Sequence, residues 1–336
     1  MMEFVSTPGV LLATYVHNLD PIIFRINDAI ALRWYGLSYL AAFLVGIWLL
    51  NFLAKRKLWV LPPGAASDFI AAAAIFGVFI GGRLGYMLWY EPREHGWSWL
   101  WEDPLRIVRV WDGGMASHGG ILGLVVFTWF YSRKKKVSWT GLGDGLCVVA
   151  PLGIMFGRLA NYINGELYGR IAEGVSWAVK FPTSLVEPDR VESMRYDQAM
   201  AAVMEVEPRL MDVPDRQLFG AMRAYQLENP EISRALDPFL EPRHPSQLYQ
   251  AGMEGLLLFL ILWTVRLKFP KLPHGVLTGL FFIFYAVFRI IGEQFREPDS
   301  NKSFVGIFTS GQFLSLFMIA IGAAFVIAAY QRKRTT

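Results

Sequence analysis

Charged side chains are scarce in this chain. They make up 18% of its 336 residues, whereas hydrophobic residues make up 54%; soluble domains carry about 25% charged residues. Apolar windows of roughly 20 residues, the length that crosses a bilayer, recur along the sequence. The composition therefore argues against a soluble protein. It predicts an all-α, polytopic integral membrane protein that forms one domain over residues 1–336.

Cysteine and metal-ligand patterns are also nearly missing. Cys147 is the only cysteine, so no disulfide can form within the chain. No basic segment precedes the short apolar run within residues 1–18, and a cleaved signal peptide is therefore not expected. No histidine or carboxylate pair stands at metal-ligand spacing, so we expect neither a metal nor another cofactor.

The apolar windows predict seven membrane spans, of which the third is short. They are Tyr35–Ala54, Asp68–Trp89, Gly119–Tyr131, Leu142–Asn161, Gln247–Val265, Val276–Gly292 and Gly311–Tyr330.

Lysine is confined to a few places, which predicts the orientation. Of the ten lysines, eight follow spans one, three, five and seven. By the positive-inside rule these ends are cytoplasmic, so the N-terminus is expected on the outer side of the membrane and the C-terminus in the cytoplasm. The net charge of +4 then reflects topology and contact with anionic membrane lipids. It gives no reason to expect nucleic-acid binding.

Most of the unusual polar residues fall in the outer half of the predicted membrane. Ionised groups at this depth cost a few kcal/mol or more unless they are paired or serve a site. A transporter usually places such residues near the midplane, whereas a one-sided cluster favours an enzyme that acts on lipid headgroups. The residues are Tyr35, Arg83, His118, Arg158, Asn161, Glu166, Glu254, Arg289, Glu293 and Arg296. Asp144, near the cytoplasmic start of span four, is the exception.

Arginine is the natural side chain for a phosphate because its planar fork donates two parallel hydrogen bonds. Arg158 and Arg289 are the best placed. Arg83 is expected either to bind phosphate as well or to pair with a carboxylate such as Glu293.

His118 is flanked by glycines that include Gly113 and Gly119. Such glycines let a backbone approach a headgroup closely. A neutral imidazole can also accept a proton near neutral pH, which makes His118 a candidate base.

Five motifs, in order along the chain, resemble those of bacterial prolipoprotein diacylglyceryl transferases. They are Leu32–Leu37, Trp111–Gly120, Gly157–Arg170, Arg243–Tyr249 and Phe288–Asp299. The resemblance implies a seven-span inner-membrane enzyme with a periplasmic-facing site. It would move diacylglycerol from phosphatidylglycerol to the lipobox cysteine of a preprolipoprotein and release glycerol phosphate.

The resemblance also implies roles for single residues. His118 matches the family's essential histidine, Arg158 the signature arginine and Arg289 the second essential arginine. The family's important tyrosine, asparagine and glutamate match Tyr35, Asn161 and Glu166. The residues alone leave two alternatives open: another outer-leaflet phospholipid transferase, and a lipid or solute transporter that uses the same arginines.

A polar insertion separates the fourth and fifth predicted spans. Residues 184–242 hold twelve Asp and Glu against six Arg and no Lys, a net charge of −6. Two stripes at helical spacing predict short amphipathic helices, and Pro188, Pro208, Pro214, Pro230 and Pro238 break the segment into pieces. The stripes are Met194, Gln198, Ala201, and Leu218, Met222, Tyr225. We expect a periplasmic head region without an active site of its own.

Overall fold

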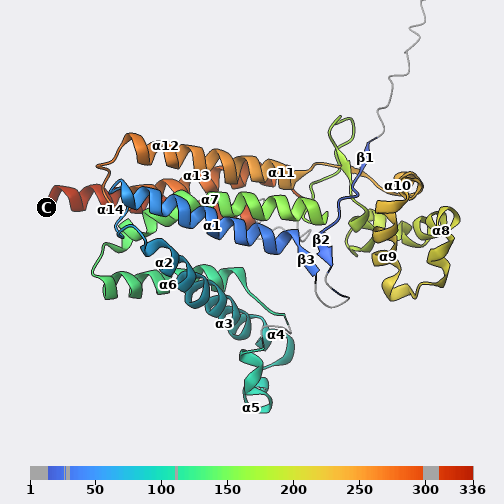
Figure 1. Ribbon diagram of the computed structural model, residues 1–336, viewed down its shortest axis with the longest axis horizontal. Helices are drawn as coiled ribbons and strands as arrows, with labels where there is room; N and C mark the ends of the chain where they lie inside the picture. Colours follow the sequence, from blue (N-terminus) through green and yellow to red (C-terminus); the bar gives the residue numbers. More distant parts are fainter. Residues whose placement is uncertain (1–13, 26, 28–30, 110–112, 298–309, 336) are drawn as a thin grey trace, which may run out of the picture. The chain divides into compact units, whose positions relative to one another are not determined.

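The computed structural model describes residues 14–25, 27, 31–109, 113–297 and 310–335 (Figure 1). Most of these residues are helical, and the chain is a multi-pass membrane protein. Among the described residues, six helices are long and apolar enough to cross a membrane. They are Trp34–Lys55 (α1), Ala65–Arg93 (α2 to α4), Trp139–Asn164 (α7), Ser246–Lys268 (α11 to α12), Val276–Glu293 (α13) and Phe313–Arg332 within Ser310–Thr335 (α14).

Six of the seven predicted spans thus coincide with such helices. The third predicted span coincides with α6, Ser117–Lys135, which has 19 residues but is not among the helices apolar enough to cross a membrane. Its last turn carries Arg133, Lys134 and Lys135, and its first turns hold His118 and two glycines. Only the middle of α6 is therefore apolar, and its crossing of the membrane remains a prediction.

The chain divides into two compact units. The first comprises Met1–Ala41, Gly153–Leu257 and Tyr285–Phe317, and the second comprises Ala42–Leu152, Leu258–Phe284 and Met318–Thr336. Several long helices contribute residues to both units.

The first unit contains short strands that the all-α prediction did not include. Strands of two to four residues are too short to show an alternating pattern, so sequence periodicity could not reveal them. A three-stranded sheet has the order β1-β4-β5, and a separate hairpin pairs β2 with β3. The bounds are Tyr15–Val16 (β1), Ile22–Arg25 (β2), Ala31–Arg33 (β3), Val179–Lys180 (β4) and Pro242–Arg243 (β5).

Three helices with their own hydrophobic core follow β4 in the first unit and form the head (Figure 1). They are Tyr196–Val206 (α8), Asp215–Glu228 (α9) and Pro230–Leu236 (α10). The stripe of Leu218 and Met222 on α9 is buried as predicted. The first predicted stripe is wrong: α8 buries Ala199, Met200 and Val203, while Met194 is 81% exposed. A 3-10 turn over Val191–Arg195 shifts the phase of the helix that follows.

His17 ties the segment after β1 to the head. Its imidazole is fully buried, and Arg223 of α9 donates to its backbone oxygen over 2.7 Å. Burial, and then the positive charge of Arg223, lower the pKa of His17 to about 4. The imidazole is therefore neutral at physiological pH.

In the second unit, α3 (Ile80–Trp89) packs closely on α6. A Cβ added to Gly81 would lie 2.8 Å from Cα of Gly123, and one added to Gly119 would lie 2.7 Å from Cα of Gly85. Both helices thus carry glycines four residues apart at their contact, the small-residue pattern that lets membrane helices approach.

Candidate active site

Two arginines from different helices share one buried carboxylate in the first unit. Arg158 lies near the end of α7 and Arg289 near the end of α13, while Glu254 lies in the π-helical segment Ala251–Leu257 (η8). Arg158 Nη2 is 3.9 Å from Glu254 Oε2, and Arg289 Nη1 is 3.8 Å from Glu254 Oε1. The shared carboxylate offsets the repulsion between the two guanidinium groups and holds them near each other.

The contacts are ion pairs rather than hydrogen bonds. Among the described residues, neither Glu254 carboxylate oxygen nor Arg289 Nη1 has a hydrogen-bond partner, although Glu254 is fully buried. The side chains of Arg158 and Arg289 are 19% and 15% exposed. Donors buried without partners are costly unless a ligand completes them, so this arrangement is suited to receive an anion.

Local backbone features bring Arg158 and Glu254 together. A Cβ added to Gly255 would lie 2.6 Å from Cβ of Met155, so only glycine permits this approach of η8 to α7. The π-helical turn also changes the phase of the helix at Glu254, and such turns often occur at functional sites.

Glu293 supports Arg289 from the next turn of α13. Glu293 Oε2 is 3.2 Å from Arg289 Nη2, an i,i+4 pair, so the arginine that Glu293 contacts is Arg289. Arg296 is also buried and interacts electrostatically with Glu254. Three arginines against two glutamates leave one positive charge in excess, which favours a bound anion such as phosphate.

Tyr35, Asn161 and Glu166 form a second polar cluster in the first unit. The Tyr35 hydroxyl donates to Glu166 Oε1, and Asn161 Nδ2 donates to the same oxygen over 2.7 Å. Asn161 Nδ2 also donates to the Tyr35 hydroxyl. Gln247 Nε2 holds the backbone oxygen of Glu166 over 2.6 Å. The Glu166 carboxylate is thus held in place by Tyr35 of α1 and Asn161 of α7.

The segment after Glu166 is joined to two other motifs by backbone pairing. Gly169 N donates to His244 O over 2.8 Å, and Arg170 N donates to Phe295 O over 2.9 Å. A Cβ added to Gly169 would lie 2.6 Å from His244 O, so this crossing requires glycine. Three motifs that are distant in sequence therefore meet at Gly169.

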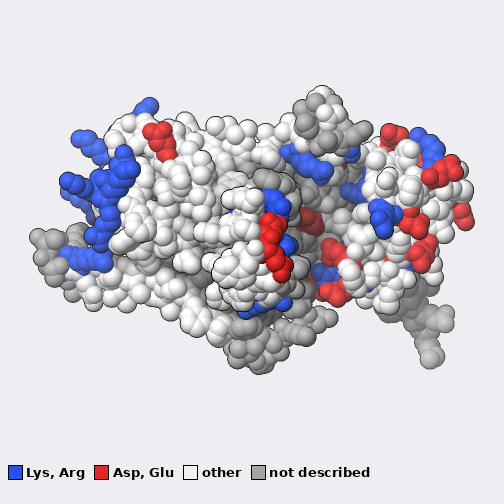
Figure 2. Space-filling model, turned by 90° about the horizontal axis from the view of Figure 1, so that it is seen from below, with Lys and Arg blue, Asp and Glu red and all other residues white. Residues whose placement is uncertain are grey.

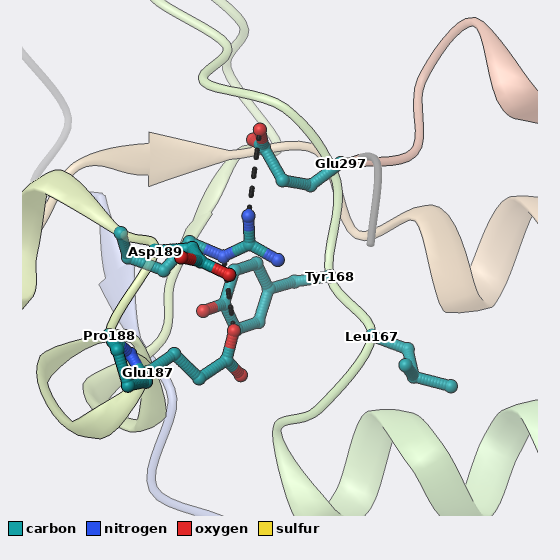
Figure 3. Close-up of a pocket in the computed structure, with 7 residues that line it drawn as sticks. Leu167, Tyr168, Glu187, Pro188, Asp189 and Glu297 are labelled. Carbon is teal, nitrogen blue, oxygen red and sulfur yellow. Dashed lines mark hydrogen bonds and ion pairs between the residues drawn. The ribbon is translucent and has the colours of Figure 1, made fainter. Parts of the chain in front are cut away.

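A polar pocket of about 270 Å³ lies beside this crossing, and Figure 3 shows Tyr168, Glu187 and Glu297 around it. Arg190 Nε contacts Glu187 Oε2 at 3.0 Å, and its Nη1 lies 3.7 Å from Glu297 Oε1. The guanidinium groups of Arg190 and Arg243 lie 5.6 Å and 5.0 Å from the centre of the Tyr168 ring. These ion pairs and cation–π contacts stabilise the backbone next to the Glu166 cluster.

The second unit holds His118 and Arg83. His118 is the second residue of α6 and is exposed. Among the described residues, no hydrogen bond to its imidazole is observed.

Arg83 is almost completely buried, and all its N–H groups are directed at backbone carbonyls. Nε donates to Ile107 O over 3.0 Å, and Nη1 donates to the oxygens of Gly113 and Gly114. Nη2 donates to the oxygens of Arg106 and Arg109. A guanidinium has five N–H donors, and five carbonyls use them. The structure therefore corrects both predictions for Arg83: it anchors the loop before α6, with no donor left for phosphate or for Glu293.

The glycines near His118 have structural roles within the protein itself. Gly119 faces α3, so its missing side chain serves helix packing rather than approach by a lipid. Gly113 and Gly114 have φ angles of 82° and 78°, which allow both carbonyls to turn toward Arg83. The added Cβ of Gly113 would meet no atom within 4 Å, so a headgroup contact there remains a prediction.

Comparisons with known proteins identify the family of this chain. The model of the family "Prolipoprotein diacylglyceryl transferase" matches residues 21–328. The chain belongs to the prolipoprotein diacylglyceryl transferase family.

Individual family members match over nearly their whole lengths. A phosphatidylglycerol–prolipoprotein diacylglyceryl transferase of Bdellovibrio bacteriovorus is 38% identical, with 93% of each chain covered. The enzyme of that name from Serratia proteamaculans is 36% identical over 94% of this chain and 95% of its own. The one from Shigella boydii is 35% identical over 96% and 97%.

Among the transferase-family residues predicted from sequence, the structure brings two sets together within the first unit. Arg158, Arg289 and Glu293 form one, and Tyr35, Asn161 and Glu166 form the other. The sequence indicates Glu254 only as one of several polar residues in the outer half of the predicted membrane. Glu254 lies about two turns into an apolar span, where a carboxylate needs a positively charged partner. This position is the signal in the sequence that predicts a contact with an arginine.

Proposed function

We propose that this chain transfers the diacylglyceryl group of phosphatidylglycerol to the lipobox cysteine of a preprolipoprotein and releases glycerol 1-phosphate. The names of its relatives specify phosphatidylglycerol and prolipoprotein as substrates. The observation that carries the proposal is the Arg158–Glu254–Arg289 cluster, an anion site at the ends of membrane helices.

The reaction is an alkyl transfer. The cysteine sulfur attacks a glycerol carbon of the lipid, a C–S bond forms, and the C–O bond to phosphate breaks with its electron pair going to the phosphate. The thiol must lose its proton, because the thiolate is the nucleophile and an ordinary thiol has a pKa of about 8.5. We assign proton removal to His118.

Arg158 and Arg289 are assigned to the phosphate. Their donors would neutralise the charge that grows on the leaving group, and preorganised donors of this kind commonly contribute a few kcal/mol each. Glu254 and Glu293 keep the guanidinium groups in position, and Arg296 adds positive charge. The Tyr35–Asn161–Glu166 cluster is assigned to the polar part of the lipid headgroup.

The membrane arrangement completes the proposal. With α6 as a third, short span, the chain crosses the inner membrane seven times. Basic residues end α1, α6 and α12, which supports a cytoplasmic location for those ends and a periplasmic N-terminus. Residues 184–242 then form a periplasmic head within a single transferase domain.

Product analysis tests the function. Purified protein receives phosphatidylglycerol and either a lipobox peptide or the same peptide with serine in place of cysteine. Release of glycerol phosphate only with the cysteine peptide is expected. Release with both peptides would indicate another phospholipid transferase, and movement of intact lipid without release would indicate a transporter.

A further inference from the structure

A cavity of about 690 Å³ lies where α6 ends and α7 begins, within the second unit. Arg133, Lys136 and Arg332 line it, together with Ser132, Ser138 and Thr140. Among the described residues, the lining contains no carboxylate. We call this cavity the cationic cradle. None of the residues assigned to the transfer reaction lines it.

The chain builds the cradle from two helix ends. Lys136 terminates α6 in a left-handed conformation with φ 54°, and Ser138 caps α7 because its Oγ accepts from Gly141 N over 3.1 Å. The positive end of the α7 dipole is thus near the cradle and adds to the attraction for anions.

Aromatic side chains border the cradle. The Arg133 guanidinium lies 5.2 Å from the centre of the Trp129 ring, and Trp129 is 42% exposed. The Trp139 indole N–H donates to Thr128 Oγ1 over 3.1 Å. Partly exposed tryptophans next to basic residues are typical of the level of lipid headgroups.

An apolar groove of about 240 Å³ adjoins the cradle, and both share Trp139, Thr140 and Arg332. Ala324, Phe325, Ala328 and Ala329 of α14 line the groove. A positively charged cavity thus lies next to an apolar groove. An anionic phospholipid likewise has a charged headgroup next to apolar acyl chains.

A contrasting cavity of about 260 Å³ in the same unit has cations but also a carboxylate. Lys57 and Arg266 line it together with Asp144. Figure 2 shows that Lys and Arg gather where these helix ends lie, so surface charge alone does not distinguish the cradle. Two features distinguish the cationic cradle from this second cavity: its lining has no carboxylate among the described residues, and an apolar groove adjoins it.

We propose that the cationic cradle binds the headgroup of an anionic diacyl phospholipid of the inner leaflet, with an acyl chain in the adjoining groove. Arg133 can hold a phosphate through its fork, and Lys136 and Arg332 add charge. On the proposed topology this end is cytoplasmic, where basic pockets between membrane helices meet anionic lipid. The lipid would join the ends of α6, α7 and α14.

Tryptophan quenching measures the binding. Full-length protein in phosphatidylcholine nanodiscs is titrated with phosphatidylglycerol that carries brominated acyl chains. Arg133→Gln/Lys136→Gln should weaken the site by about a hundredfold, because it removes two charge-assisted contacts and each contact of about 1.4 kcal/mol corresponds to a factor of ten. Trp139→Phe should remove part of the quenching.

The matched control is Lys268→Gln/Lys271→Gln, which removes the same charge from residues outside the cradle and groove. The control should bind like wild type. An equal loss in the control would show that only general surface charge attracts the lipid and would overturn the proposal.

Two further measurements define the ligand. Ala328→Phe should fill the groove and weaken binding of the diacyl lipid without removing any charge. Competition by millimolar inorganic phosphate as strong as that by the lipid would identify a free anion as the ligand and overturn the lipid assignment. Transfer activity in detergent should be unchanged in the cradle variants, so this proposal and the proposed function fail independently.

Discussion

Replacement of Arg83 by lysine should disorder the loop before α6 although the charge is kept. Arg83 holds five carbonyls between Arg106 and Gly114, whereas lysine has three donors on a single nitrogen and cannot reach carbonyls spread around a planar fork. At least two carbonyls lose their partner.

The magnitude follows from those losses. A hydrogen bond to a charged group contributes about 1.5–3 kcal/mol, so two or more lost bonds should lower the free energy of local opening by about 3–6 kcal/mol. The loop leads directly into the helix turn that carries His118. A misplacement of about 1 Å can reduce turnover about a hundredfold, so kcat should fall more than KM rises.

Hydrogen exchange of residues 103–116 and steady-state kinetics measure these effects. Arg93→Lys is the matched control, because Arg93 is exposed and contacts only a Trp89 ring face at 6.0 Å among the interactions described for it. Unchanged hydrogen exchange in Arg83→Lys, or a rise confined to KM for phosphatidylglycerol, would refute the anchoring role. Either result would favour a role of Arg83 in phosphate binding.

Three other changes test the remaining parts of the site. Arg158→Lys should lose most activity in a folded protein, since a point charge lacks the bidentate fork; near-normal turnover would remove Arg158 from the phosphate site. His118→Gln should abolish turnover with little effect on lipid binding, and a peptide with a more acidic thiol should partly restore it; a loss confined to lipid binding would contradict the assignment as base. Acidification should destabilise the protein through His17, whose pKa is about 4 when folded and about 6.5 when unfolded. Between these values only the unfolded state gains the proton, so stability falls by up to about 3 kcal/mol as pH drops from 6.5 to 4. Thermal unfolding at pH 7 and pH 4.5 measures this change, and His17→Gln should make it smaller.

Sequence patterns predicted the spans well because a membrane helix needs about 20 apolar residues in a row. The predicted span within α6 is the shortest for the same reason, since glycines and basic residues occupy the two ends of this helix. The head helices were predicted, but the phase of α8 was wrong because a 3-10 turn precedes it.

The side-chain roles were predictable only where the partner is also a side chain close in sequence. Glu293 and Arg289 are four residues apart, so their pairing could be expected on a helix. The partners of Arg83 are backbone carbonyls, which leave no mark in a sequence. Glu254 reaches Arg158 because Gly255 lets two helices approach, and that contact depends on tertiary packing.

The mass of a lipobox peptide after incubation with the purified protein and phosphatidylglycerol tests the central claim most directly. The proposed reaction predicts a gain of one diacylglyceryl group on the cysteine that survives hydroxylamine at neutral pH, because neutral hydroxylamine cleaves thioesters but leaves the thioether and the acyl oxygen esters intact. An unmodified peptide, or an added group that hydroxylamine removes as it removes a thioester, would contradict the proposed transfer.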